Sequence, residues 1–215
     1  MTVKSYCHRG GDTALLGETI PGNFTRIAKQ FPGNEAIVSI PHNRRLTYSQ
    51  LSEATDRVAK GLLALGFGKS DRLGVWSTNN IEWLLLQLAA ARIGVVLVNI
   101  NPAYRPRELA YALQRSEVEC LVTIPSFRTS DYVSMLVELV PELKTAKPGE
   151  FRNDELPFLR RVLLYDPAVP ENTRRPSPGF DTWGELLAGG ERVKQEPLEM
   201  ATAELDIDDP INIQY

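Results

Sequence analysis

Apolar residues along residues 47–140 follow two alternating periods, one typical of amphipathic helices and one typical of buried strands. The clearest helix prediction is Tyr48–Leu65, where apolar side chains recur at steps of three and four residues and so share one face: Leu51, Ala54, Val58, Leu62 and Leu65. Thr47 and Gln50 have the spacing of a capping box, and Gly66 stands where a helix would end.

Short strands alternate with helices through the rest of this region. The pattern predicts strands at Leu73–Trp76, Val95–Asn99 and Val118–Ile124. Three helices are predicted between and after these strands. The first is capped by Asn79 with Glu82 and ends at Gly94, and the second runs from Pro106 to about Ser116. The third is capped by Ser130 and runs through Val140. Such alternation favours parallel βαβ units with right-handed crossovers. The predicted fold class is therefore α/β with a mostly parallel sheet.

The flanking segments are less regular. Before residue 47, the sequence predicts a helix at Asn23–Phe31 and a hairpin of two strands, Glu35–Ile40 and Arg45–Thr47. After residue 140, it predicts a strand at Arg161–Tyr165, a helix at Trp183–Leu187 stopped by Gly189 and Gly190, and a strand at Ile211–Tyr215.

The predicted organisation is one domain with an irregular lead-in. Residues 1–22 form the lead-in and 23–215 form the α/β domain, with a proline-rich loop region at 141–180. Residues 191–207 are charged and are predicted to be peripheral.

Composition excludes several classes of protein. The 215 residues are 43% hydrophobic and carry a net charge of −3, and no basic block indicates nucleic-acid binding. The most apolar stretch, Ile81–Ile100, is interrupted by charged and polar residues and fits a buried helix plus a strand better than a membrane span. The N-terminus has no apolar signal core, and Cys7 and Cys120 do not form a disulfide framework. These observations predict a cytoplasmic protein with reduced thiols.

No complete catalytic set is visible. Gly66–Ser70 contains the Gly-Lys-Ser of a phosphate loop, but Leu63 replaces the motif's first glycine and the segment follows a helix instead of a strand. A helix-to-strand turn is therefore the favoured interpretation, and the absence of a G-x-G-x-x-G segment excludes a dinucleotide fingerprint.

Other candidate residues have structural explanations that are preferred. Cys7 with His8 would be a weak metal site near a terminus, and His42 lies in a turn. Asp208 with Asp209 could chelate Mg²⁺, although paired acids before a strand are more often a solvated turn. The three tryptophans are expected to fill core or interface positions: Trp76, Trp83 and Trp183.

Several short runs together resemble the N-terminal region of AMP-forming acyl-CoA synthetases, in the adenylate-forming ligase superfamily. The resemblance covers about Leu16 to Tyr215, and its order and spacing are more specific than any single motif. The runs are Leu-Thr-Tyr-x-x-Leu (46–51), Gly-Leu-x-x-x-Gly (61–66) with Asp-Arg-Leu-Gly-Val (71–75), Asn-Asn-x-Glu-Trp (79–83), Ala-x-x-x-Gly (90–94), Asn-Ile-Asn-Pro-Ala-Tyr-Arg (99–105) and Ser-Phe-Arg-Thr-Ser-Asp-Tyr (126–132). The last two look most like the fatty-acyl-CoA synthetase branch that includes acyl-CoA synthetase family member 2.

The resemblance implies an ATP-dependent activation of a fatty acid. In such enzymes a carboxylate attacks the α-phosphate of ATP to give an acyl-adenylate and pyrophosphate, and the thiol of CoA then displaces AMP. The implied cofactors and substrates are ATP, Mg²⁺, CoA and a fatty acid, and the implied fold is the N-terminal subdomain of acetyl-CoA-synthetase-like proteins.

The resemblance also predicts that residues 1–215 alone are inactive. The family's phosphate-binding loop follows a strand similar to Asp209–Tyr215, and the sequence stops before that loop. No catalytic or metal-binding residue of the family maps onto the chain, and none of the cofactors is expected to bind it tightly. The terminal strand should be central in the family fold, so exposed apolar faces are expected to favour association or aggregation.

One peripheral binding residue remains a candidate. In the family, the nucleotide end of CoA can run along the N-terminal domain, and the resemblance makes Arg128 a candidate contact. Arg105 is a weaker one, with a capping role near the Pro106 helix as its structural alternative. The alternative for the whole chain is a non-catalytic α/β fragment or partner-binding module.

Overall fold

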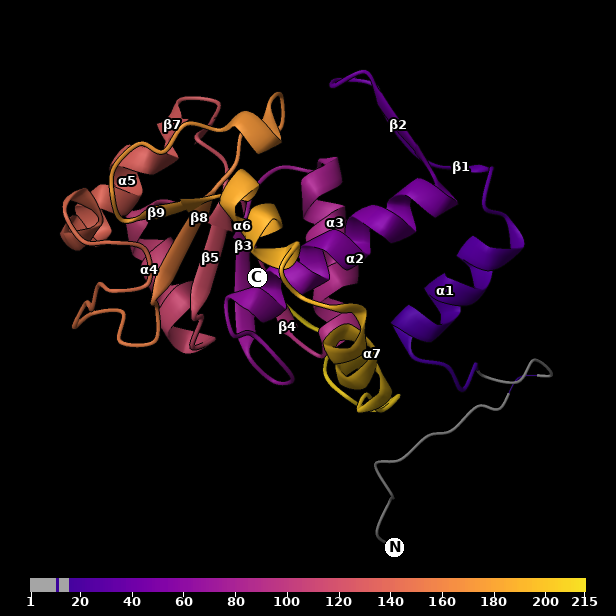
Figure 1. The fold of residues 1–215 in the computed structure, drawn as a ribbon. Helices are drawn as coiled ribbons and strands as arrows, with labels where there is room; N and C mark the ends of the chain where they lie inside the picture. Colours follow the sequence, from indigo (N-terminus) through magenta and orange to yellow (C-terminus); the bar gives the residue numbers. More distant parts are fainter. Residues whose placement is uncertain (1–10, 12–15) are drawn as a thin grey trace, which may run out of the picture.

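A computed structural model describes residue 11 and residues 16–215, and its centre is a six-stranded parallel sheet (Figure 1). The strand order is β10-β4-β3-β5-β8-β9, and every neighbouring pair is parallel. The strands are β3 (Arg72–Trp76), β4 (Val96–Ile100), β5 (Cys120–Thr123), β8 (Arg161–Leu164), β9 (Phe180–Thr182) and β10 (Asn212–Gln214). The predicted α/β fold with parallel βαβ units is confirmed.

Helices cover both faces of the sheet. Figure 1 shows α4 and α5 on one side and α2 and α3 on the other, while α6 packs on α2 and α7 packs on α3. The connection from β3 leads to β4, and the next connection returns past β3 to β5, so two right-handed crossovers require opposite faces. The helices are α2 (Tyr48–Ala64), α3 (Ile81–Ile93), α4 (Pro106–Arg115), α5 (Tyr132–Leu139), α6 (Trp183–Gly190) and α7 (Gln195–Ala203).

Smaller elements complete the described chain. A helix, α1 (Ile20–Gln30), and an antiparallel hairpin lie beside α2, at the opposite end of the molecule from α4 and α5 (Figure 1). The short elements are β1 (Glu35–Ser39), β2 (Arg44–Thr47), β6 (Ser126–Phe127), β7 (Ser130–Asp131) and the 3₁₀ turns η1 (Pro141–Lys144) and η2 (Pro170–Asn172). The hairpin was predicted from its two extended runs, and its pairing is confirmed.

Local signals at the best-predicted helix are present as expected. The Thr47 hydroxyl accepts from the Gln50 amide at 3.3 Å, and the Gln50 side chain accepts from the Thr47 amide at 2.9 Å, so the capping box is confirmed. Gly66, just after α2, has φ of +88°, and Gly94 ends α3 with φ of +75°. Glycine is the residue that adopts this left-handed backbone at least cost.

Two predicted helix caps are wrong by one residue. Asn80, not Asn79, caps α3, because its Oδ1 accepts from the Trp83 amide at 2.9 Å. Likewise Asp131, not Ser130, caps α5, because its Oδ1 accepts from the Ser134 amide at 2.9 Å. In both places two adjacent residues have capping side chains, and only the actual turn geometry selects the one three residues before a free amide.

Two segments are more ordered than the sequence pattern indicated. The first helix begins at Ile20 instead of Asn23. Thr19 caps this helix, and Pro21 stands in its first turn. Residues 191–207, expected to be peripheral, contain α7, whose Leu198 is fully buried and whose Thr202 hydroxyl donates to the Arg92 carbonyl at 3.0 Å. A charged segment with one buried leucine has no repeating pattern of apolar residues, so the sequence did not indicate this helix.

The helix predicted at Trp183–Leu187 runs three residues further, and α6 ends at Gly190, the second of the two predicted stop glycines. Gly190 lies at a close crossing with α2. A Cβ on Gly190 would lie 2.7 Å from the Gly61 nitrogen, and a Cβ on Gly61 would lie 2.6 Å from the Leu186 carbonyl oxygen. Glycine is needed at this crossing because a side chain at either position would collide with the facing helix.

We predict that Gly61→Ala lowers the free energy of unfolding by about 1–3 kcal/mol, because the added methyl group would force the two helices apart. Gly189→Ala is the matched control. Its Cβ would meet only the Ala64 Cβ at 3.5 Å, so higher helix propensity should stabilise the protein by up to about 1 kcal/mol. Urea unfolding measures both, and equal stability of the two variants would contradict the close crossing.

Candidate functional site: the carboxyl edge of the parallel sheet

The carboxyl ends of β3, β4 and β5 form the candidate site. The connection after β3 runs to α3 on one face, whereas those after β4 and β5 run to α4 and α5 on the other. Open α/β sheets bind ligands where neighbouring connections diverge in this way. The residues at these strand ends are therefore the first to consider.

A stacked aromatic pair, Trp76 and Tyr132, lies at one side of this edge. The Trp76 and Tyr132 rings are stacked, with centroids 3.5 Å apart and an interplanar angle of 5°. The Trp76 Nε1 donates to the Asn101 carbonyl at 3.2 Å, and the Tyr132 hydroxyl donates to the Pro102 carbonyl. Both residues are fully buried, so the pair ties β3 and α5 to the loop after β4 and presents no ring to a ligand.

A second set of hydrogen bonds joins the ends of β3 and β8. The Tyr165 hydroxyl lies 2.8 Å from the Ser77 Oγ and donates to the Asn80 Oδ1 at 3.0 Å. The Asn80 Nδ2 in turn donates to the Ser77 Oγ at 3.0 Å, which closes a triangle. Burial raises the pKa of Tyr165 above its ordinary value of 10.0, so this hydroxyl stays protonated at neutral pH. The network is a satisfied scaffold, without a free nucleophile.

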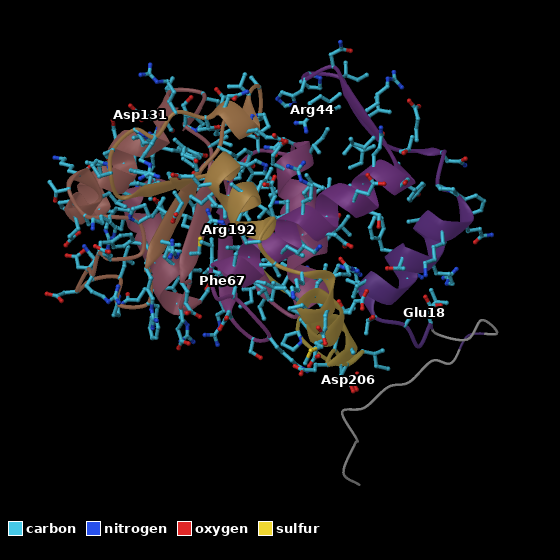
Figure 2. The ribbon with its side chains drawn as sticks, viewed as in Figure 1. Glu18, Arg44, Phe67, Asp131, Arg192 and Asp206 are labelled. Atoms are coloured by element: carbon cyan, nitrogen blue, oxygen red, sulfur yellow. The ribbon has the colours of Figure 1, made fainter. Side chains whose placement is uncertain are left out.

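Arg128 lies at the outer part of this edge, in the turn between β6 and β7. Its backbone is in the left-handed region, with a φ of +52°, its side chain is exposed, and its guanidinium lies 5.0 Å from the Phe127 ring centroid. The turn borders an open depression of about 460 Å³ that also includes Asp131, labelled in Figure 2. Hydrogen bonds from Ser134 lower the pKa of Asp131, so the depression has one cationic and one anionic side chain.

The other arginine candidate has a local role. The Arg105 amide donates to the Glu108 side chain at 3.0 Å at the start of α4, and the Arg105 side chain is exposed. This arrangement agrees with the predicted position beside the Pro106 helix. Among the described residues, the Arg105 side chain takes part in no salt bridge.

The Gly66–Ser70 segment is the helix-to-strand turn that its place in the sequence predicts. Gly66–Ser70 connects α2 to β3, and the Lys69 Nζ donates to the Glu204 carbonyl at 3.0 Å and pairs with Asp209 at 2.7 Å. Asp209 also accepts from the Asp206 amide at 2.7 Å, as expected for a turn. Residues 11 and 16–215 contain no cluster of three His, Cys, Asp or Glu side chains suited to a metal.

The remaining candidates are placed as follows. Cys120 is buried in β5 and unpaired, and burial raises the pKa of its thiol, as expected for a core cysteine. His42 lies in the turn of the β1–β2 hairpin with Nδ1 3.0 Å from the Ser39 Oγ. Cys7 and His8 lie outside the described residues. Trp183 is buried and Trp83 packs against the core, so the structural role predicted for the tryptophans is confirmed.

Within the part of the chain that the structure covers, no helix has the length and apolarity needed to cross a membrane. Ile81–Ile100, the most apolar stretch, forms α3 and β4 as predicted.

Comparison with known proteins decides the family. Residues 24–215 match the family model described as AMP-binding enzyme. The chain belongs to the AMP-binding enzyme family. This places the parallel sheet and its carboxyl edge within the adenylate-forming enzymes, as the sequence resemblance implied.

Relatives within the AMP-binding family include acyl-CoA ligases. The chain is 38% identical over 212 residues to the medium-chain acyl-CoA ligase ACSF2, mitochondrial, of Rattus norvegicus, covering 98% of this chain and 33% of the relative. It is 34% identical to the putative acyl-CoA synthetase YngI of Bacillus subtilis, covering 94% of this chain and 35% of the relative. The chain therefore spans about a third of the length of these relatives.

Solved structures share the fold at lower sequence identity. A coronafacic acid ligase from Pectobacterium brasiliense has a TM-score of 0.68 and 16% identity, covering 92% of this chain and 33% of that one. A Mycobacterium tuberculosis fatty acyl CoA synthetase has a TM-score of 0.60 and 18% identity, covering 92% and 32%. At these identities the likeness shows the fold alone.

Sequence reasoning missed the Ser77–Asn80–Tyr165 network. Tyr165 is separated from Ser77 and Asn80 by 88 and 85 residues, and periodicity does not report pairs so far apart. The cap at Asn80 was the accessible signal, because a side chain three residues before Trp83 is expected to meet its amide.

We predict that Tyr165→Phe lowers the free energy of unfolding by about 1–2 kcal/mol, since Ser77 and Asn80 each lose a partner near the buried edge. Tyr111→Phe, at a side chain that is 62% exposed, is the control and should change stability little. Urea midpoints followed by tryptophan fluorescence give both values. A Tyr165→Phe protein as stable as the parent would show that the triangle contributes nothing.

Proposed function

We propose that this chain forms the N-terminal α/β part of an enzyme that activates a fatty acid, first to an acyl-adenylate and then to an acyl-CoA. The observation that carries the proposal is the 38% identity, over nearly the whole chain, to a protein named a medium-chain acyl-CoA ligase. Membership of the AMP-binding enzyme family supports adenylate chemistry, and the relatives' names support an acyl substrate.

The proposed substrates are a fatty acid, ATP and CoA, with Mg²⁺ as the metal. Attack of a carboxylate on a phosphate requires positive charge and amide donors aimed at the developing negative charge. Residues 16–215 offer no metal-binding cluster and no glycine-rich loop that opens a helix after a strand. These residues do not by themselves fit Mg²⁺ or the ATP phosphates, so we assign no catalytic step to them and propose that residues 1–215 alone are inactive.

A domain swap tests the proposal directly. Residues 24–215 would replace the matching third of the rat medium-chain ligase, and the chimera would be assayed for ATP–pyrophosphate exchange and acyl-CoA formation with fatty acids of graded length. We expect exchange with the chimera and none above a no-enzyme blank with the 215-residue chain. A folded chimera that is inactive with every fatty acid would contradict the proposed function, and exchange by the chain alone would contradict its inactivity.

The alternative is a non-catalytic module that binds a partner. It is favoured by the outer side of β10, which has no paired strand among the described residues, and by Ile211 and Tyr215, which are 38% and 37% exposed beside it. Association through this edge would be a consequence of either proposal, whereas an inactive but folded chimera would favour the module. A cytoplasmic location also stays a prediction, which cell fractionation can decide, since the mammalian relatives are named mitochondrial.

Arg128 is proposed to contact the nucleotide end of CoA. The support is its position in the β6–β7 turn that follows β5 at the carboxyl edge, and the exposure of its side chain. Arginine suits phosphate recognition because its planar fork presents several fixed donors.

In the active chimera, Arg128→Ala should raise the KM for CoA about two- to fivefold while leaving kcat unchanged, as expected for one exposed charge. The control is Arg192→Ala, an exposed arginine between α6 and α7 that is labelled in Figure 2. An unchanged KM for CoA in the Arg128 variant, or equal changes in both variants, would remove Arg128 from the CoA site.

A further inference from the structure

A cavity of about 190 Å³, partly open to solvent, lies between β2 of the hairpin, helices α2, α3 and α6, and the turn η2. Its walls are mostly apolar and include Ala54 of α2 and Trp183 of α6. Four charged side chains also line it: Arg44, Arg57, Glu82 and Glu171. A cavity can hold one water molecule if it leaves about 10–15 Å³ for the centre of a water-sized sphere and if polar groups are there to bind the water.

Glu82 is a buried charged residue of the cavity lining. Its side chain is 1% exposed, and its Oε1 accepts from the Arg44 Nη1 at 2.5 Å. Figure 2 labels Arg44 on the hairpin, near the start of α3. The second carboxylate oxygen, Oε2, is buried and has no hydrogen-bond partner within the described chain. A buried carboxylate oxygen without a donor is costly, so a donor from outside the protein is expected.

The charges around the cavity indicate a neutral ligand. Arg44 already compensates the carboxylate of Glu82. Arg57 and Glu171 form a looser pair at 3.8 Å, and both side chains are at least half exposed, so they mark the side that opens to solvent. With two positive and two negative groups, the lining has no net charge to attract an ion, and the remaining need is a small hydrogen-bond donor.

We propose that the cavity is a bound-water site, in which a water molecule donates a hydrogen bond to the Glu82 Oε2. The water completes the contact by which Arg44 and Glu82 hold the hairpin against α3. Glu82 lies two residues after Asn80, which caps α3 and belongs to the Ser77–Tyr165 network. The hydrated pair therefore positions the hairpin relative to the carboxyl edge of the sheet, and this inference does not depend on the proposed ligase function.

The sign of a cavity-filling substitution tests the proposal. Ala54→Leu would fill a dry cavity and stabilise the protein, but would displace a water bound to Glu82 and leave the carboxylate unpaired. We expect the folding equilibrium constant, from urea unfolding at low protein concentration, to fall roughly 5- to 30-fold. Ala64→Leu places the same change at an exposed position of the same helix and should have little effect.

A second background separates hydration from crowding. In a protein carrying Arg44→Leu and Glu82→Leu, no polar group remains to hold the water, so Ala54→Leu should no longer destabilise. An equal fall in both backgrounds would mean that leucine is simply too large, and a rise in the parent would mean that the cavity is dry; either result overturns the proposal. If the variants do not fold, a crystal structure of the parent decides the proposal. A water molecule within hydrogen-bond distance of the Glu82 Oε2 supports the proposal, and an empty cavity there refutes it.

Discussion

The pairing of β3 with β4 on one side and β5 on the other is the constraint on which the rest of this structure depends. Gly74 at the centre of β3 leaves room for Val118, Leu121 and Ile100, and a Cβ there would come within 3.0 Å of Val118. Because both neighbours are parallel to β3, their connections must cross the sheet on opposite faces. That requirement places α3 against α2 and places α4 beside α5, and it brings Ser77, Asn101 and Pro125 to one edge.

The carboxyl edge is held rigidly before any ligand is considered. Trp76, Ser77 and Tyr165 use their polar atoms on the protein itself, and Thr123 donates to the Trp76 carbonyl at 3.0 Å. Such an edge positions loops well and offers little chemistry of its own. This agrees with a chain that spans about a third of its acyl-CoA ligase relatives and supplies scaffold to the proposed reaction.

The elements that could be predicted from sequence are those whose signals are local. The stripe on α2, the Thr47–Gln50 capping box and the continuous apolar run of β4 each depend on residues close together in the chain, and each appears in the structure. The family could be predicted as well, because several short motifs occur in a fixed order. Arg128 lies after β5, as its place behind the predicted Val118–Ile124 strand indicated, but a single exposed arginine has no local pattern that assigns a ligand.

The features that escaped prediction depend on distant contacts. Gly190 lies against Gly61 of α2, and α7 packs on α3 with Thr202 donating to the Arg92 carbonyl. Similarly, Glu82 has the pattern of a helix N-terminus in the sequence, and nothing there indicates that Arg44, 38 residues earlier, reaches it. Each of these pairs combines residues whose separation exceeds the range of any periodic signal.

The position of β10 beside β4 has a consequence for how the chain folds. Ile213 pairs with Val98, more than a hundred residues earlier, so this contact closes one of the longest loops in the molecule. Contacts of such range form slowly, and on the ribosome β4 is complete seconds before β10 emerges. During that interval one side of β4 is an unpaired strand edge. All residues of β4 are buried in the native state. The newly made chain is therefore most exposed to wrong pairing at β4 until β10 emerges.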